Sequence, residues 1–87
     1  VWGVGEYADL LLDNSITFSK TKVKFFVDSS TFKQGVIFRN TKVLEPEKII
    51  SSNLPILIAS SFWYHEILDQ IESLGVKNNR ILSGSFI

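Results

Sequence analysis

The residues best placed to do chemistry lie at the start of the chain, where Gly3, Gly5 and Ala8 form the pattern G-x-G-x-x-A. In a dinucleotide-binding turn the first glycine permits a tight turn, the second leaves room for a phosphate, and the third small residue lets the helix pack on the strand. Unpaired N–H groups at the start of that helix favour an anion. The pattern predicts a nucleotide or another phosphate-bearing ligand, and a purely structural turn stays open as the alternative.

A second candidate, Asp28, follows the apolar stretch Val23–Val27 and lies 23 positions after Gly5. This spacing is near the ~20 residues at which an acidic side chain meets a ribose hydroxyl, although an aspartate that caps a turn is equally typical of this place. Ser60 and Ser61 follow the apolar run 55–59, where an open α/β sheet binds its ligands. The predicted binding residues are Gly3, Gly5, Glu6, Tyr7, Asp28, Ser29, Ser60 and Ser61.

Other residues limit the chemistry that the sequence predicts. Glu6 suits the start of a helix but repels a phosphate unless its side chain points outward. Tyr64, His65 and Glu66 are the only clustered titratable residues near the predicted crevice, with no nucleophile or second histidine, so no catalytic residue is predicted. The absence of cysteine excludes zinc-thiolate sites, and a single histidine disfavours any metal. Phe62 and Trp63 are interpreted as packing residues rather than a base-stacking platform.

Composition narrows the class of protein further. With 87 residues, 45% of them hydrophobic, the chain is expected to form one domain, residues 1–87. Nine basic and nine acidic residues cancel, which disfavours nucleic acid as a partner, and no apolar run is long enough to span a membrane. A cytoplasmic protein is expected. The lack of methionine and the short stretch before Gly3 indicate a fragment of a longer protein.

The elements that must position these residues follow from hydrophobic periodicity. A helix from Tyr7 to Leu12 is ended by residues 13–15, and residues 16–22 connect it to a strand over 23–27. Two extended pieces, 36–38 and 42–44, form an excursion at the sheet edge, and a short helix over 45–50 has Pro46 at its first position. A strand over 55–59, a helix from Tyr64 to Leu74 ended by Gly75, and a last strand beginning at Ile81 (81–87) complete the chain.

This element order predicts an α/β fold, a small Rossmann-like open parallel sheet with helices on both faces and core strand order 2-1-3-4. Several short motifs also resemble the small Rossmann-like domains of bacterial sugar-modifying enzymes. They are Gly3-x-Gly5-x-x-Ala8, Phe26-Val27-Asp28, Lys33-Gln34-Gly35, Val43-Leu44-x-Pro46-Glu47, Ile58-Ala59-Ser60 and Glu66-Ile67.

The resemblance covers residues 1 to about 82. It is to the C-terminal domain of sugar C-methyltransferases and the N-terminal domains of nucleotide-sugar acetyltransferases and capsule-type sugar epimerases. It implies that Gly5, Asp28 and Ser60 lie near a uridine or similar moiety.

The function expected from the residues and the resemblance is that of a nucleotide or nucleotide-sugar binding domain in a larger cytoplasmic enzyme of sugar or surface-polysaccharide metabolism. The parent enzyme would be a methyltransferase or acetyltransferase, this domain would be its non-catalytic part, and its partners would be the nucleotide-type ligand and the other domains. The alternative is a Rossmann-like interaction module that has retained no ligand. An independent NAD-dependent oxidoreductase is disfavoured, because half of the usual fold cannot hold both nucleotides.

Overall fold

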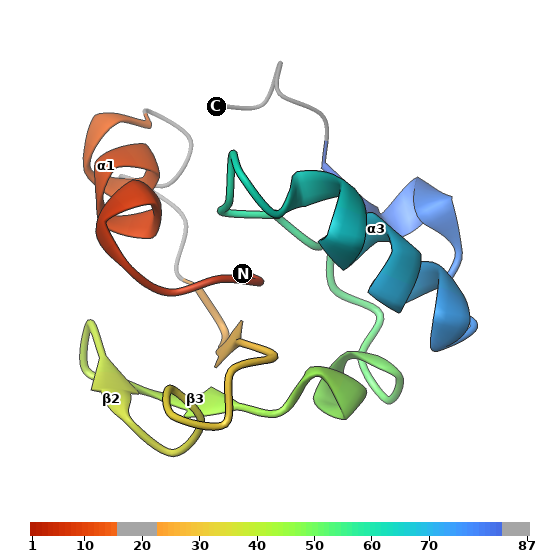
Figure 1. Cartoon of the computed structure of the whole chain (residues 1–87), viewed down its shortest axis with the longest axis horizontal. Coiled ribbons are helices and arrows are strands. Elements are labelled where there is room, and N and C mark those ends of the chain that lie inside the picture. The colour runs from red at the N-terminus through yellow and green to blue at the C-terminus, as the bar shows by residue number, and fades with distance from the viewer. Residues whose placement is uncertain (16–22, 83–87) are drawn as a thin grey trace.

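The computed structural model of the chain describes residues 1–15 and 23–82. The predicted connection over 16–22 and residues 83–87 of the predicted last strand lie outside the described residues. Figure 1 shows the N-terminal segment between the two α-helices, with the strands below it in this view. In chain order the elements are α1 (Glu6–Asn14), β1 (Phe26–Val27), β2 (Ile37–Phe38), β3 (Thr41–Leu44), the 3₁₀-helix η1 (Pro46–Ile49), α3 (Tyr64–Ser73) and the 3₁₀-helix η2 (Asn78–Arg80).

Both predicted α-helices are confirmed. Helix α1 buries Ala8 and Leu12, which lie one turn apart on the same face, and it ends where Ser15 turns to extended backbone. Helix α3 buries Ile67 and Ile71 with the same spacing. Gly75 follows α3 with φ +78°, a conformation in which glycine carries no steric penalty. The short helix begun by Pro46 is also present, as η1.

The strands form a mixed sheet with the order β1-β3-β2. Strand β1 pairs in parallel with β3, so that Phe26 faces Val43, and β2 pairs antiparallel with β3. The β2–β3 hairpin turns through Arg39 and Asn40, both with positive φ (49° and 62°). Two consecutive residues of this kind give the turn that matches the right-handed twist of a two-residue hairpin.

The predicted fold class is wrong. The part of the chain described here contains a three-stranded mixed sheet and two α-helices, and not a Rossmann-like four-stranded parallel sheet with helices on both faces and strand order 2-1-3-4. Within residues 1–15 and 23–82, pairing outside the named strands consists of isolated parallel bridges, from Trp2 to Val27 and to Ile58 and from Ile56 to Ile81. The two extended pieces predicted over 36–38 and 42–44 are present as the β2–β3 hairpin. Strand β2 lies at the sheet edge, whereas β3 is the central strand and not an excursion.

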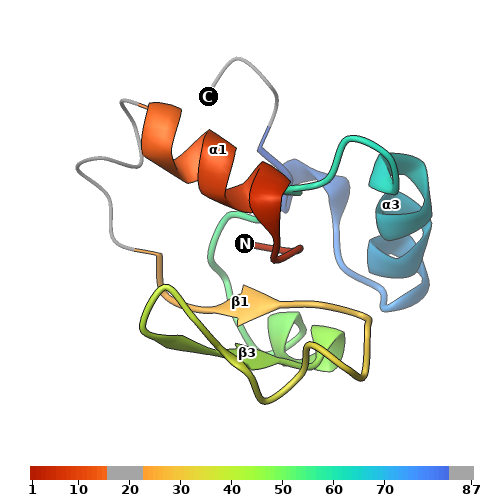
Figure 2. The ribbon, with the colours of Figure 1, turned by 60° about the vertical axis from the view of Figure 1, so that its left-hand side comes forward.

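The N-terminal segment is nevertheless held on both sides by backbone hydrogen bonds. The N–H of Trp2 donates to Leu57 O, and its carbonyl accepts from the N–H of Ala59, both at 2.8 Å. On the other side the N–H of Gly3 donates to Val27 O at 2.8 Å. Figure 2 shows this segment beside β1 and below the start of α1. These bonds place the glycine turn next to Ala59 and next to the loop that follows β1.

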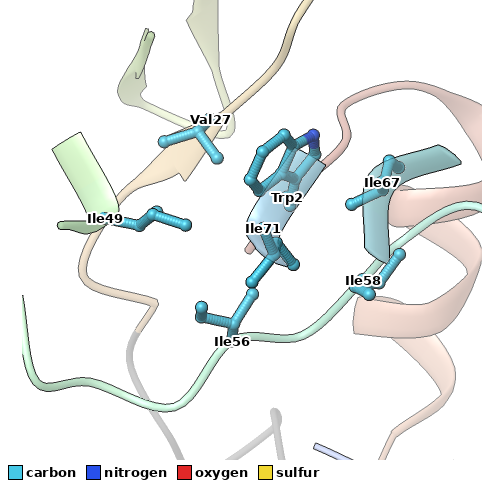
Figure 3. Close-up of a cluster of buried hydrophobic side chains, with 7 residues drawn as sticks. All are labelled: Trp2, Val27, Ile49, Ile56, Ile58, Ile67 and Ile71. Atoms are coloured by element: carbon cyan, nitrogen blue, oxygen red, sulfur yellow. The ribbon is translucent and has the colours of Figure 1, made fainter. Parts of the chain in front are cut away.

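Two groups of buried side chains stabilise the fold. The larger surrounds Trp2, which is 1% exposed, and Figure 3 shows its ring among aliphatic side chains from β1, η1, α3 and residues 56–58. The smaller joins Leu12 of α1 to Phe26 and Val43, and the ring of Phe38 meets Phe26 edge-on with centroids 5.0 Å apart. Within residues 1–15 and 23–82 no helix is long and apolar enough to cross a membrane.

Candidate functional site

One cavity of about 550 Å³ brings the predicted binding residues together. This volume is in the range of pockets that hold small-molecule ligands, roughly 300 to 1,000 Å³. Three segments form its walls: the glycine turn with the start of α1, the loop after β1, and the segment that leads into α3. All eight predicted residues line it, namely Gly3, Gly5, Glu6, Tyr7, Asp28, Ser29, Ser60 and Ser61.

Gly3 and Gly5 are each required in the turn for a different physical reason. Gly3 has φ +110°, and a Cβ at this position would lie 2.8 Å from the carbonyl oxygen of Ala59, so the two backbones can approach only without a side chain. Gly5 has φ +151° and ψ −165°, a region that is almost restricted to glycine, yet the nearest atom to a Cβ there is Lys33 Nζ at 3.8 Å. Gly3 therefore serves packing, whereas Gly5 leaves open space at the cavity.

The start of α1 offers backbone donors to this space. The first intrahelical hydrogen bond runs from the N–H of Asp9 to Gly5 O at 3.1 Å, and no side chain caps the helix at Gly5. The N–H groups of Glu6, Tyr7 and Ala8 precede this bond and have no partner within the helix. Such groups and the helix dipole favour an anion.

Asp28 links two walls of the cavity. Its Oδ2 accepts from the N–H of Val4 at 3.1 Å, and its Oδ1 accepts from the N–H of Ser30 at 2.8 Å. The side chain of Gln34 donates to the Asp28 carbonyl at 2.8 Å and holds the same loop. Asp28 therefore acts as a capping aspartate, as the structural alternative expected. Each carboxylate oxygen keeps a further lone pair that can accept from a hydroxyl.

Lys33 is a site residue that the sequence reasoning missed. Its Nζ donates to Val4 O at 2.8 Å, which holds the ammonium over the glycine turn and 3.8 Å from the Cβ position of Gly5. Among the residues that the structure describes, it is the only lysine or arginine in the cavity lining. The sequence indicates Lys33 only as part of the Lys33-Gln34-Gly35 motif, because nothing in the local sequence says that a loop after β1 folds back on residues 3–5.

The third wall carries two aromatic side chains that were interpreted as packing residues. Phe62 and Trp63 are 79% and 57% exposed, so neither is part of the described core. The Ser60 hydroxyl oxygen accepts from the N–H of Trp63 at 3.0 Å and fixes the turn before α3. Glu66, one turn further along α3, also lines the cavity.

The charge of the cavity limits what it can hold. Three carboxylates, Glu6, Asp28 and Glu66, face one ammonium, Lys33. This balance favours a ligand with hydroxyl groups and few phosphates. His65 is exposed, packs edge-on against Tyr64 with ring centroids 5.9 Å apart, and does not line the cavity. In the described ranges no three histidine, cysteine, aspartate or glutamate side chains gather in a way that could hold a metal ion.

Comparison with known proteins identifies the family. The model of the C2185-like, N-terminal family matches residues 1–82, and the chain therefore belongs to this family. No curated protein and no solved structure matches the chain. The description of the family states no activity, so the match defines membership and not chemistry.

Proposed function

We propose that this domain binds a nucleotide or nucleotide sugar as the non-catalytic part of a larger cytoplasmic enzyme of sugar or surface-polysaccharide metabolism, of methyltransferase or acetyltransferase type. The observation that carries the proposal is the cavity of about 550 Å³ that the open glycine turn, the Lys33 ammonium and the Asp28 carboxylate share. These groups suit the two parts of a nucleotide other than the base, namely the phosphate and the ribose.

The phosphate end would lie over Gly5. There the N–H groups at the start of α1 favour an anion, the missing Cβ leaves space, and Lys33 Nζ supplies a positive charge. The surplus of carboxylates in the lining favours a monophosphate or a sugar diphosphate over a triphosphate, whose additional charge Glu6 and Glu66 would repel.

The sugar end would lie toward Asp28 and the serines. Asp28 already accepts two backbone N–H groups, which fixes its carboxylate in one orientation, and its remaining lone pairs can accept from ribose or hexose hydroxyls. The hydroxyls of Ser29, Ser60 and Ser61 line the same space and can both donate and accept.

The proposal that this domain belongs to a larger sugar-modifying enzyme is supported by the sequence motifs and by the family. The short motifs that resemble domains of sugar C-methyltransferases and nucleotide-sugar acetyltransferases suggest the metabolic context. The description of the family as N-terminal is consistent with one part of a longer protein.

An interaction module without a ligand is the second candidate, and one observation favours it. Large apolar side chains are exposed away from the cavity, with Phe32 93% and Ile37 65% accessible. Exposed apolar residues of this size often contact another domain or subunit. The two candidates differ in whether the glycine turn responds to a small molecule.

The deciding experiment is a chemical-shift titration of the ¹⁵N-labelled chain with UDP, CDP, NAD, S-adenosylmethionine and CoA. We expect UDP or CDP to shift the amides of residues 3–8 and 28–30. Lys33→Gln, which keeps a donor for Val4 O but removes the charge, should weaken binding, whereas Lys77→Ala, exposed and outside the cavity, should not. If no compound moves these amides, the ligand-binding proposal fails and the interaction module replaces it.

A further inference from the structure

Phe62 and Trp63 form an aromatic pair whose exposure the fold does not explain. Their rings meet edge-on, with centroids 4.8 Å apart and planes at 79°, so each supports the other while its remaining surface stays open. Neither belongs to the two buried clusters of the described residues. Keeping two large apolar rings in water is unfavourable, which makes such a pair a candidate contact for a ligand or partner.

The backbone beneath the pair is fixed although the rings are not buried. The N–H of Trp63 donates to the hydroxyl oxygen of Ser60 at 3.0 Å, and the Trp63 carbonyl accepts the first hydrogen bond of α3, from Ile67 N–H at 2.9 Å. Ile67 is itself buried against Trp2 in the larger core cluster. A rigid attachment lowers the entropic cost of using these rings to bind a flat group.

The position of the pair relative to the charged groups gives the class of ligand. Phe62 and Trp63 line the same cavity as Lys33, from the wall that leads into α3, whereas Lys33 approaches from the loop after β1. A ligand that spans this cavity therefore meets aromatic surface on one wall and a positive charge on another. Nucleoside phosphates carry these two features, a planar heteroaromatic base and an anion, joined by a ribose.

We infer that Phe62 and Trp63 are the base-stacking platform of the nucleotide site, with the base on the aromatic pair, the ribose toward Asp28 and the phosphate beneath Lys33. This inference rests on the proposed function and adds the subsite that selects a nucleoside over a sugar phosphate. Stacking tolerates any base, because every base has a π face, so affinity from this pair does not depend on which base is present.

The test compares UMP, AMP and GMP with ribose 5-phosphate and inorganic phosphate, by chemical-shift titration of the chain and its variants. Trp63→Ala should weaken the nucleotides by roughly 5- to 150-fold, the range for loss of one base–aromatic stack, and Trp63→Phe should recover most of the affinity. The same substitution should change the affinity for ribose 5-phosphate and phosphate less than about twofold, because those probes have no ring to stack.

Phe32→Ala is the matched control, since this ring is 93% exposed and does not line the cavity. The dispersion of the amide chemical shifts reports whether each variant keeps its fold. Nucleotide affinity unchanged in a folded Trp63→Ala protein would overturn the platform while leaving the nucleotide site in place. Equal weakening of ribose 5-phosphate would also overturn it. If the unaltered chain binds none of the nucleotides, the proposed function fails and the platform with it.

Discussion

Asp28 is the side chain on which the shape of the candidate site most depends. Both of its carboxylate oxygens accept backbone N–H groups, one from Val4 in the glycine turn and one from Ser30 in its own loop. Asp28→Ala leaves two donors without partners, and we expect the free energy of unfolding to fall by about 1 to 3 kcal/mol. Urea denaturation measures this, with Asp69→Ala, exposed on α3, as the control. A loss below about 0.5 kcal/mol would contradict the capping role.

A separate measurement concerns the ribose role of Asp28. If its remaining lone pairs hold a ribose, Asp28→Asn should weaken nucleotide binding by about 1.5 to 3 kcal/mol, the range for hydrogen bonds to a charged group. Its affinity for inorganic phosphate should change less. The dissociation constant is measured under conditions in which the variant is fully folded. Unchanged nucleotide affinity would remove Asp28 from the ligand contacts and leave it with the capping role alone.

The effect of a close backbone contact at Gly3 can be measured by comparing Gly3→Ala with Gly75→Ala, since both glycines have a positive φ. Gly3→Ala places a Cβ 2.8 Å from the Ala59 carbonyl oxygen in addition to the backbone strain of φ +110°, and we expect a loss of more than about 2 kcal/mol of stability. Gly75→Ala, at φ +78° with open space around it, carries the backbone strain alone, about 1 kcal/mol. Thermal unfolding of both variants gives the comparison. Equal losses would mean that the close approach of residues 3 and 59 is not tight.

Between elements, Arg39 ties the β2–β3 hairpin to α1. Its guanidinium forms ion pairs with Asp9 at 2.8 Å and Asp13 at 3.0 Å, and the hydrogen bonds that it donates to these carboxylates raise the pKa of Arg39. All three side chains are more than a third exposed, so we expect Arg39→Ala to lower stability by only about 0.5 to 1 kcal/mol. The loss should shrink in 1 M NaCl, because salt screens exposed ion pairs.

The backbone conformation of Arg39 predicts that replacing it with glycine has a different effect on stability from replacing it with alanine. Arg39 has φ +49°, which costs a residue with a side chain about 1 kcal/mol, and Arg39→Gly removes that cost along with the ion pairs. We therefore expect Arg39→Gly to be more stable than Arg39→Ala, and close to the unaltered chain. Denaturation of both variants in low salt measures the difference. The reverse order would show that the positive φ of Arg39 is not strained.

The helices could be predicted from sequence and the sheet could not, for a physical reason visible in single residues. Leu12 in α1 and Ile71 in α3 lie at helical spacing from their buried neighbours, and that spacing alone defines which face is buried. An apolar run such as residues 55–59 predicts burial. It does not predict which strand the run pairs with, or over how many residues the pairing extends. Only isolated bridges form there, whereas Val43 pairs with Phe26 across a distance in sequence that periodicity does not encode.

The residues of the candidate site could likewise be predicted only in part. The glycine spacing and the ends of the apolar runs indicated eight residues, and all eight are among those that line the cavity, because chain direction decides where those ends meet. Lys33 and Trp63 were missed as site residues. Lys33 comes from a loop whose position depends on Asp28 and Gln34, and an exposed tryptophan has the same sequence signature as a buried one until the helix that follows it is oriented.

For the molecule as a whole, the larger buried cluster joins stability to the site. Ile58, 4% exposed, packs in this cluster with Trp2, and the next residue, Ala59, contacts Gly3 and donates to Trp2 O at 2.8 Å. We expect Ile58→Ala to lower stability by about 2 to 5 kcal/mol and Ile58→Val by about 0.5 to 1.5 kcal/mol. A chain of this length has a total of roughly 4 to 13 kcal/mol, so the alanine variant can be largely unfolded. A loss under about 1 kcal/mol for alanine would mean that residues 56–58 are not central to the fold.

The same variant tests whether the site belongs to the folded state alone. A ligand that binds only the folded chain stabilises it by about 2.7 kcal/mol at a concentration one hundred times its dissociation constant. A nucleotide at that concentration should therefore restore much of the cooperative unfolding transition of Ile58→Ala and raise the midpoint of Ile58→Val, as followed by the NMR signals of the folded chain. Inorganic phosphate at the same concentration should give a smaller rise, because it fills only the space over Gly5. An equal rise from both would place all of the binding energy at the glycine turn and none at the remaining walls of the cavity.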